Sequence, residues 1–292
     1  MIIVMRRWCR VLFIIIKENK IMKLVDFEKS IRAIVGTAVE TFASTFCERH
    51  LSEIENPDGT INMKIHNVFI SVLGEEIQYY TALVRSLDSS LGNMLESMAM
   101  KIAEISYKVH KSVEGHLTLK QTQDIAELLE QYKRRTKIPE ITDYQLLRKS
   151  NYNNSDQIKR HDSDYYLIDE ETNSHYLIEL KIGGDLDNKK ARSEKEAILE
   201  QFAILSNTLP KNSNIKCFFA TAYNRYGENK EWKQERVKQF FAKDELLIGK
   251  DFWNFICKDD KGYNLIMEEL NKYNPLVISA LRIVCKKYNL AA

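Results

Sequence analysis

The sequence predicts an α/β (α+β) fold, in which a small sheet lies within an otherwise helical chain. Apolar residues recur at spacings of three and four from residue 22 to about residue 132, as on one face of a helix. Short apolar runs separated by polar turns follow Pro139, and helical patterns return after residue 225. The chain has 292 residues, of which 44% are hydrophobic, and this excludes a disordered protein or a disulfide scaffold.

The first 21 residues differ from the rest of the chain. They carry a net charge of +4 and an apolar run over residues 11–16. That run is too short to cross a bilayer, which takes about 20 residues, and no small-residue cleavage site follows it. Met22 opens a smooth amphipathic sequence instead. We therefore expect residues 1–21 to be a non-native leader from a misassigned start, and residues 22–292 to form a single domain.

A helical N-terminal part is expected over residues 22–135. Its longest apolar stripe runs from Leu83 to Ile105, and the helical pattern resumes after Gly115. The clear break before that stripe is the turn signal at residues 56–59.

The central part, about residues 140–225, is expected to hold the sheet, and residues 226–292 form a helical C-terminal part. A polar turn joins the first two predicted strands, and an amphipathic helix separates the second strand from the third. The predicted strands cover residues 165–168, 175–181 and 215–222, and the helix covers about 188–206.

The turn between the first two strands determines which side chains meet. A turn centred on the polar run places Asp164 opposite Glu179, and Asp162 opposite Lys181. Directly opposed residues share a face of a sheet, with Cβ atoms about 4.5 to 5.5 Å apart. We therefore expect these four side chains to converge on one face, with apolar side chains on the other.

This cluster of charges predicts a specific chemistry. Two adjacent carboxylates repel each other unless a cation lies between them, and a hard divalent ion with oxygen ligands meets that need. Mg²⁺ is the predicted cofactor, because it binds one or two carboxylates together with phosphate oxygens. A nearby lysine can hold or polarise the attacking water, so the cluster predicts phosphodiester hydrolysis. The Glu-x-Lys pattern alone is common at solvated strand ends; the paired acids favour the site.

The arrangement Asp164-x14-Glu179-Leu180-Lys181 resembles the PD-(D/E)XK nuclease superfamily, most closely its type II restriction endonucleases. The string IELKIGGDLDNKKA, residues 178–191, is similar to the TdeIII-like family. The resemblance extends to residues 86–96 and 248–253. It implies a restriction-endonuclease-like core, a small mixed sheet flanked by helices, with the central part as the catalytic core.

The resemblance also implies roles for individual residues. Asp164 and Glu179 bind Mg²⁺, the backbone carbonyl of Leu180 is a further ligand, and Lys181 acts on the nucleophilic water. The sequence departs from the motif because no proline precedes the aspartate. The choice between Asp162 and Asp164 is therefore open, and we prefer Asp164 for its position opposite Glu179.

Glu96 is a further acidic candidate, because a helix before the sheet often supplies another acid in this superfamily. The alternative is a solvated glutamate at the edge of the apolar stripe.

Positive charge is gathered locally rather than spread over the chain. The formal net charge is only +2, which excludes a polycation that coats nucleic acid, whereas residues 131–160 carry a net charge of +5. A local patch of this kind is what contacts to DNA phosphates require. The candidates for these contacts are Lys159, Arg160, Lys189, Lys190 and Arg192.

Three of these cations begin the predicted helix at residue 188, where positive charge opposes the helix dipole. A bound phosphate would relieve that conflict. The alternative is that Asp185 and Asp187 cap the helix and offset the charge. Residues 151–155 are a predicted loop whose amides either contact base edges or form a turn.

The predicted function is a type II site-specific restriction endonuclease that cleaves double-stranded DNA. Because one site per chain must serve two antiparallel strands, we expect a homodimer. The resemblance implies a GGNCC-like target, with a cognate DNA methyltransferase as a functional rather than physical partner. Five scattered cysteines indicate a reducing, cytoplasmic location, and no membrane partner is expected.

Other functions fit parts of the same pattern. One is another PD-(D/E)XK nuclease, for repair or transposition, and a second is a non-catalytic DNA-binding module on the same fold. A third is a helical scaffold protein with a chance hairpin. The joint presence of Asp, Glu and Lys favours the enzymes.

Overall fold

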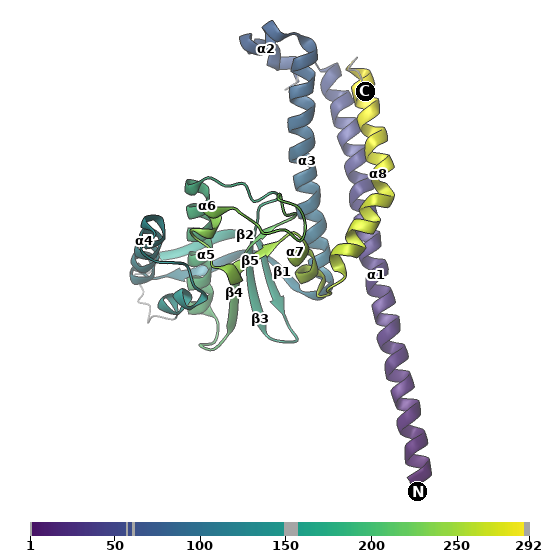
Figure 1. The fold of residues 1–292 in the computed structure, drawn as a ribbon, viewed down its shortest axis with the longest axis vertical. Coiled ribbons are helices and arrows are strands. Elements are labelled where there is room, and N and C mark those ends of the chain that lie inside the picture. Colours follow the sequence, from purple (N-terminus) through teal and green to yellow (C-terminus); the bar gives the residue numbers. More distant parts are fainter. Residues whose placement is uncertain (1, 57, 60–61, 149–156, 289–292) are drawn as a thin grey trace. The chain divides into compact units, whose positions relative to one another are not determined.

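The computed structural model describes residues 2–56, 58–59, 62–148 and 157–288, and their side chains from residue 25 onward except at residues 65 and 157 (Figure 1). The chain forms two compact units. The first, called here the helical unit, comprises Met1–Met98 and Asn264–Ala292. The second, called the sheet unit, comprises Ala99–Tyr263. The predicted division of one domain into three parts stays a prediction.

Long helices make up most of the helical unit. They are α1 (Ile2–Glu55), α3 (Glu75–Ser106) and α8 (Gly262–Lys287), with the short η1 (Asn62–His66) and α2 (Val68–Leu73) between α1 and α3. An apolar cluster that includes Phe46, Leu83 and Val284 joins the three long helices. The predicted break at residues 56–59 is confirmed, because α1 ends at Glu55 and the N–H of Gly59 donates to Asn56 O.

The N-terminal segment belongs to α1 in this structure, since that helix begins at Ile2. Whether residues 1–21 belong to the native protein stays a prediction. None of the helices formed by the described residues is long and apolar enough to span a membrane.

The sheet unit is built on a mixed five-stranded sheet in the order β1-β2-β3-β4-β5. Neighbours from β1 to β3 are antiparallel, and β3, β4 and β5 are parallel. The strands are β1 (Lys108–Leu117), β2 (Gln157–Asp169), β3 (Ser174–Leu180), β4 (Asn214–Thr221) and β5 (Leu246–Ile248). This arrangement confirms the predicted fold class.

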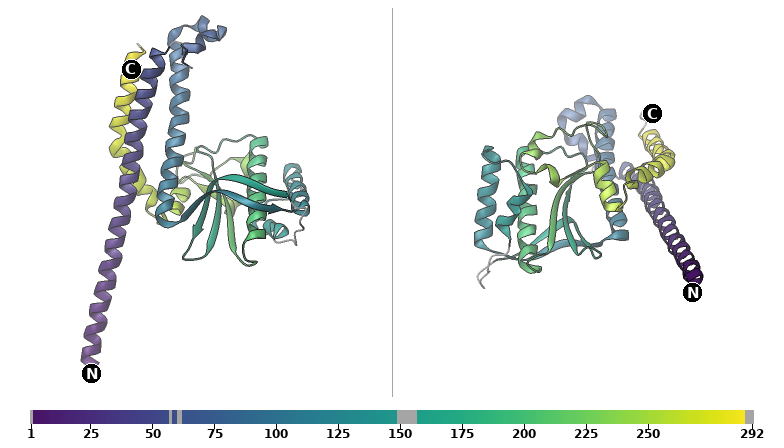
Figure 2. Two further views of the ribbon diagram at one scale, coloured as in Figure 1. Left: turned by 180° about the vertical axis from the view of Figure 1, so that it is seen from behind. Right: turned by 60° about the horizontal axis from the view of Figure 1, so that its bottom comes forward.

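One helix, α5 (Asn188–Thr208), forms the main packing partner of the sheet. It lies between the sheet and α4 (Leu119–Arg134), as Figure 2 shows. Its fully buried side chains include Ile198, Phe202 and Ile204, at the centre of the largest apolar core. The remaining elements are η2 (Ile141–Leu147), α6 (Glu235–Lys238), η3 (Lys243–Glu245) and α7 (Lys250–Cys257).

Four predicted elements are confirmed to within two residues at most ends. The predicted helix at 188–206 is α5, the strands at 175–181 and 215–222 are β3 and β4, and the strand at 165–168 lies within a longer β2. These elements have strong local signals, namely alternating apolar residues, a polar turn and an N-cap residue.

The parts predicted to be helical, residues 22–135 and 226–292, each contain one strand, so this prediction was wrong at β1 and β5. β1 lies inside the part predicted to be helical, where its buried apolar residues, Val113 and Leu117, are four apart as in a helix. Pairing with β2 along its length makes it a strand. β5 has only three residues, too few for a periodic signal, and is held by β4.

Gly115 shows how closely β1 approaches α5. A Cβ atom at this position would lie 2.9 Å from Ile204 Cγ2 and 3.0 Å from Thr208 Oγ1. A side chain would therefore force the helix away from the strand. The glycine that interrupts the helical pattern in the sequence is needed for packing.

Candidate active site

The pairing of β2 with β3 brings the predicted carboxylates together. Tyr165 lies opposite Ile178 and Asp169 opposite Ser174, which is the predicted register. The regular ladder ends at Tyr165, and the next residue, Asp164, accepts a hydrogen bond through Oδ2 from the N–H of Leu180 at 2.9 Å. Asp164 is therefore held at the end of the ladder, beside the segment that carries the other site residues.

A bulge in β2 separates Asp164 from Asp162. His110 of β1 lies opposite Tyr166, but Ser112 lies opposite Asp162, so residues 163–165 of β2 face a single residue of β1. A bulge of this kind breaks the regular pairing and re-aims side chains. The side chain of Asp162 is 93% exposed, with Arg160 Nε 3.9 Å away, whereas that of Asp164 is 39% exposed. The predicted pairing of Asp162 with Lys181 is not formed, because β3 ends at Leu180.

Lys181 is the centre of the cluster. Its Nζ donates a hydrogen bond to Glu179 Oε1, and it lies 3.9 Å from Asp164 Oδ2 and 3.4 Å from Glu194 Oε1. Three carboxylates and one ammonium give the cluster a formal charge of −2. The structure thus brings together Asp164, Glu179 and Lys181, the three residues predicted to be catalytic.

Glu194 of α5 is a member that sequence reasoning missed. A signal for it exists, because Glu194 follows Ala191 by three residues and precedes Ile198 by four, and both of these are buried. An acidic residue at such a position lies at the edge of the stripe that faces the sheet. Which residue of the sheet it would meet depends on how α5 packs.

Burial and neighbouring charges perturb two groups of the cluster. Burial, followed by the charge of Asp164, raises the pKa of Glu179 well above its ordinary value, although Lys181 opposes this shift. Burial acts to lower the pKa of Lys181, but the charges of Glu179, Asp164 and Glu194 outweigh it, so that the pKa is raised. Lys181 is therefore an ammonium ion at neutral pH.

The turn after β3 allows the chain to reach α5 from the site. The N–H of Lys181 donates to Ala220 O of β4 at 2.9 Å, and the N–H of Gly184 donates back to Lys181 O at 3.1 Å. Gly184 has φ +64°, and a Cβ atom there would lie 2.6 Å from Thr221 Cγ2. A residue without a side chain is therefore required three positions after the lysine.

The donor set fits a hard divalent cation. Asp164 and Glu179 offer carboxylate oxygens, and an ion of charge +2 would neutralise the cluster. Among the described residues, no group of three or more His, Cys, Asp or Glu side chains is arranged to hold a metal. Two carboxylates with water and phosphate oxygens are what Mg²⁺ commonly uses, so this set is sufficient.

The comparison with protein families decides the class of enzyme. The model of the HinfI type II restriction endonucleases matches residues 27–274, or 248 of the 292 residues. The chain belongs to the HinfI family of type II restriction endonucleases. It is a deoxyribonuclease of a restriction system, and DNA is its substrate. No curated protein matches the sequence.

Membership of the HinfI family decides between the functions predicted from the sequence. HinfI itself recognises GANTC. The broader expectation, a type II restriction endonuclease, is confirmed, and the repair nuclease, the silent binding module and the scaffold protein are excluded. The narrower TdeIII-like resemblance stays a prediction.

The basic residues at the start of α5 in this HinfI-family enzyme have mixed surroundings. Asp187 caps the helix, accepting a hydrogen bond from the N–H of Lys190 at 2.8 Å, so the capping alternative is correct for this residue. Asp185 instead lies 2.7 Å from Arg225. Arg192 lies 3.2 Å from Glu130 of α4. The side chains of Lys189 and Lys190 are exposed, and within the described parts of the chain neither forms an ion pair.

The two basic candidates on β2 also differ from each other. Lys159 Nζ donates to Glu200 Oε1 at 2.8 Å, while Arg160 has a side chain that is 65% exposed. His161 Nε2 lies 2.7 Å from the other oxygen of Glu200. Although burial raises the pKa of Glu200, these two partners outweigh it and lower the pKa. Lys159 is thus already neutralised, and Arg160 is the more available of the two.

Two expectations are left without a structural answer. Glu96 lies on α3 in the helical unit with an exposed side chain, so its part in a site of the sheet unit stays a prediction. The predicted loop at residues 151–155 lies outside the described residues.

Proposed function

We propose that this HinfI-family endonuclease hydrolyses DNA at the cluster of Asp164, Glu179 and Lys181, with Mg²⁺ as its cofactor. One observation carries the proposal: three carboxyl groups surround a single ammonium group at the end of a strand pair, leaving a formal charge of −2. Such a concentration of negative charge is unfavourable in a merely structural site, and it suits a divalent ion and a phosphodiester.

Each residue has a distinct proposed role. Asp164 and Glu179 would hold the ion, with the Leu180 carbonyl as a further ligand. When bound, Mg²⁺ supplies charge stabilisation at the phosphate and lowers the pKa of a bound water. Lys181 remains protonated, so it orients the water and stabilises negative charge by hydrogen bonding rather than acting as the base. Glu194 holds the ammonium group in place.

The DNA-phosphate candidates extend this site. Exposed Lys189, Lys190 and Arg160 would contact backbone phosphates directly, and Arg192 and Lys159 would do so by exchanging their present carboxylate partners. Phosphate contacts of this kind position the duplex without reading its sequence.

The products and assembly follow from the reaction. Attack of water on phosphorus with departure of the 3′ oxygen leaves 5′-phosphate and 3′-hydroxyl ends. A homodimer would present two clusters to the two strands. The proposed target is GGNCC-like, from the TdeIII-like resemblance, and GANTC is the alternative from the family's namesake. Both are twofold symmetric about one unspecified base pair, as a homodimer requires. A cytoplasmic location and a cognate DNA methyltransferase complete the proposal.

The proposal is tested by digesting long DNA of known sequence with the purified protein, with and without Mg²⁺. We expect discrete fragments only with Mg²⁺, and sequencing of their ends identifies the target. Asp164→Asn should eliminate cleavage, whereas Asp162→Asn, a matched change two residues away, should retain it. The reverse result would assign the metal to Asp162, and full activity of both variants would refute the site.

A further inference from the structure

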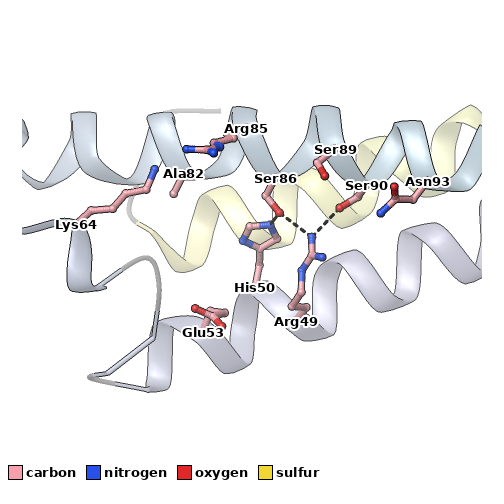
Figure 3. A pocket seen from close by; sticks show the side chains of 10 residues that line it. All are labelled: Arg49, His50, Glu53, Lys64, Ala82, Arg85, Ser86, Ser89, Ser90 and Asn93. Carbon is pink, nitrogen blue, oxygen red and sulfur yellow. Dashed lines mark hydrogen bonds between the residues drawn. The ribbon is translucent and has the colours of Figure 1, made fainter. Parts of the chain in front are cut away.

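A second charged site lies in the helical unit. A cavity of about 540 Å³ opens between α1, η1 and α3 (Figure 3). Arg49, Lys64 and Arg85 line it, one from each of these three elements, and Glu53 is the one carboxylate among the described lining residues. The cavity therefore carries three formal positive charges against one negative charge.

The cations of this cavity lack the partners that surface cations usually have. Among the described residues, none of Arg49, Lys64 and Arg85 has a carboxylate within 4 Å, whereas ion pairs are frequent elsewhere in the chain. Figure 3 shows the side chains of Lys64 and Arg85 directed toward each other. Burial and the charge of Arg85 lower the pKa of Lys64. Like charges gathered in this way are stabilised by an anion.

A hydrogen-bond network holds Arg49 in position. Its Nη2 donates to Ser86 Oγ at 2.6 Å and to Ser90 Oγ at 2.8 Å. Ser86 Oγ is also 3.0 Å from His50 Nε2, and His50 Nδ1 is 3.0 Å from the OH of Tyr288, which directly follows α8. This network uses one guanidinium nitrogen, and Nε and Nη1 have no hydrogen-bond partner among the described residues. A guanidinium edge of this kind matches the oxygens of a phosphate.

The lining also supplies uncharged donors. Ser86, Ser89, Ser90 and Asn93 recur at spacings of three and four, so they share the face of α3 that lines the cavity. Serine and asparagine, with arginine and lysine, are the side chains that contact DNA phosphates. These residues belong to the segment at 86–96 that the cluster around Lys181 does not use.

We propose that this cavity binds a backbone phosphate of the DNA substrate. The helical unit then holds the duplex at a point separate from the catalytic cluster, through contacts that do not depend on sequence. The proposal rests on DNA being the substrate, but not on which residues cleave it. A free phosphate ion has the same chemistry, and the experiment below separates the two sources.

The test compares two double variants. Lys64→Gln with Arg85→Gln removes two cations from the cavity, and Arg282→Gln with Lys286→Gln removes two exposed cations from α8 of the same unit as the control. Binding of a labelled duplex is measured without Mg²⁺ between 50 and 200 mM NaCl. Each lost phosphate contact reduces the slope of log K against log salt by about 0.9 and weakens binding about tenfold near 0.1 M salt.

We expect this loss for the cavity variant alone, and equally for duplexes with and without the target sequence. An unchanged slope and affinity would overturn the proposal. Inorganic phosphate serves as the second probe: if it raises the Tm of the wild type but not of the cavity variant, while the DNA slope is unchanged, the cavity takes free phosphate instead. Retained affinity in Arg85→Lys would support a requirement for charge, and its loss would contradict it.

These outcomes are independent of the catalytic proposal. If the cavity variant shows the expected loss of slope and affinity but the wild type never cleaves DNA, the cavity proposal stands and the proposed function fails. If the wild type cleaves at one sequence while the cavity variant binds with an unchanged slope, the reverse holds.

Discussion

The residue on which the site depends is Lys181, an ammonium group that three carboxylates approach. Its raised pKa keeps it charged, so it can attract the phosphate and orient water but cannot accept a proton at neutral pH. Its neighbours differ in burial: Glu179 is 9% exposed, and Asp164 is 39% exposed. DNA binding, the positioning of Lys181 and the protonation of Glu179 can therefore be tested separately.

Lys181→Ala should reduce the cleavage rate by about 10²–10³-fold or more, because it removes a charge aimed at the reacting group. DNA affinity should stay within about twofold, since other cations hold the duplex. Single-turnover cleavage and duplex binding measure the two effects, with Lys216→Ala, an exposed lysine of β4, as the control. Normal turnover by Lys181→Ala would sink the site assignment.

Glu194→Gln should lower the single-turnover rate by about 10- to 100-fold without changing the DNA dissociation constant, because Lys181 loses a positioning partner. Glu196→Gln, exposed on the same helix, is the matched control. A parallel loss of DNA affinity and of thermal stability would indicate a merely structural role.

Glu179→Gln tests proton occupancy in the metal-free protein. Because the pKa of Glu179 is raised in the folded state above its ordinary 4.5, the wild type binds more protons folded than unfolded and loses stability as the pH rises above that value. We therefore expect the variant, in EDTA, to be more stable than the wild type at pH 8 and to show a smaller decline from pH 5. Urea unfolding across this range measures it, and parallel curves would contradict the raised pKa.

At the scale of elements, α5 connects the site to the core. It presents Glu194 to Lys181, and the next residue, Lys195, anchors the helix from its buried side. Lys195 Nζ donates to both oxygens of Glu245, at 2.6 and 2.8 Å, and to Tyr144 OH at 3.1 Å. Both charged side chains are 1% exposed.

Lys195→Met should destabilise the protein by about 3–5 kcal/mol, because it leaves Glu245 buried without its cation. Replacing both partners, as in Lys195→Met with Glu245→Leu, should restore part of that loss. Equilibrium urea unfolding gives the values, and Lys190→Met, exposed on the same helix, should change stability by less than about 0.5 kcal/mol. A small effect of Lys195→Met would show that the anchor is dispensable.

At the scale of the whole molecule, the chain combines a sheet unit that holds the proposed catalytic cluster with a helical unit that holds the basic cavity. One such cluster per chain would cut one strand. We therefore propose that the double-strand cut at a twofold-symmetric site uses a second chain.

Sedimentation of the purified protein should accordingly give twice the mass of one chain at micromolar concentration, either free or on a target duplex. Mixing the wild type with excess Lys181→Ala protein should convert double-strand cuts into nicks, because mixed dimers carry one working site. A monomer that cuts both strands at wild-type rates in this mixture would refute the dimer.

By itself, the sequence determined the features that depend on neighbouring residues. The polar turn, the alternation along the hairpin and the Glu-x-Lys pattern were sufficient to predict Asp164 beside Glu179 and Lys181, because register follows from turn position and side-chain period. The extent of α5 was predicted from its periodicity, and its start is confirmed by the Asp187 cap.

Only the tertiary structure decided the features that depend on distant residues. β1 and β5 are strands because of the partners beside them, and the bulge opposite β1 leaves Asp162 exposed while Asp164 joins Lys181. The approach of Glu194 to Lys181 depends on how α5 packs on the sheet. Such contacts join residues far apart in the chain, so no local pattern encodes them. Tertiary packing decides between helix and strand for β1, and between Asp162 and Asp164 for the cluster.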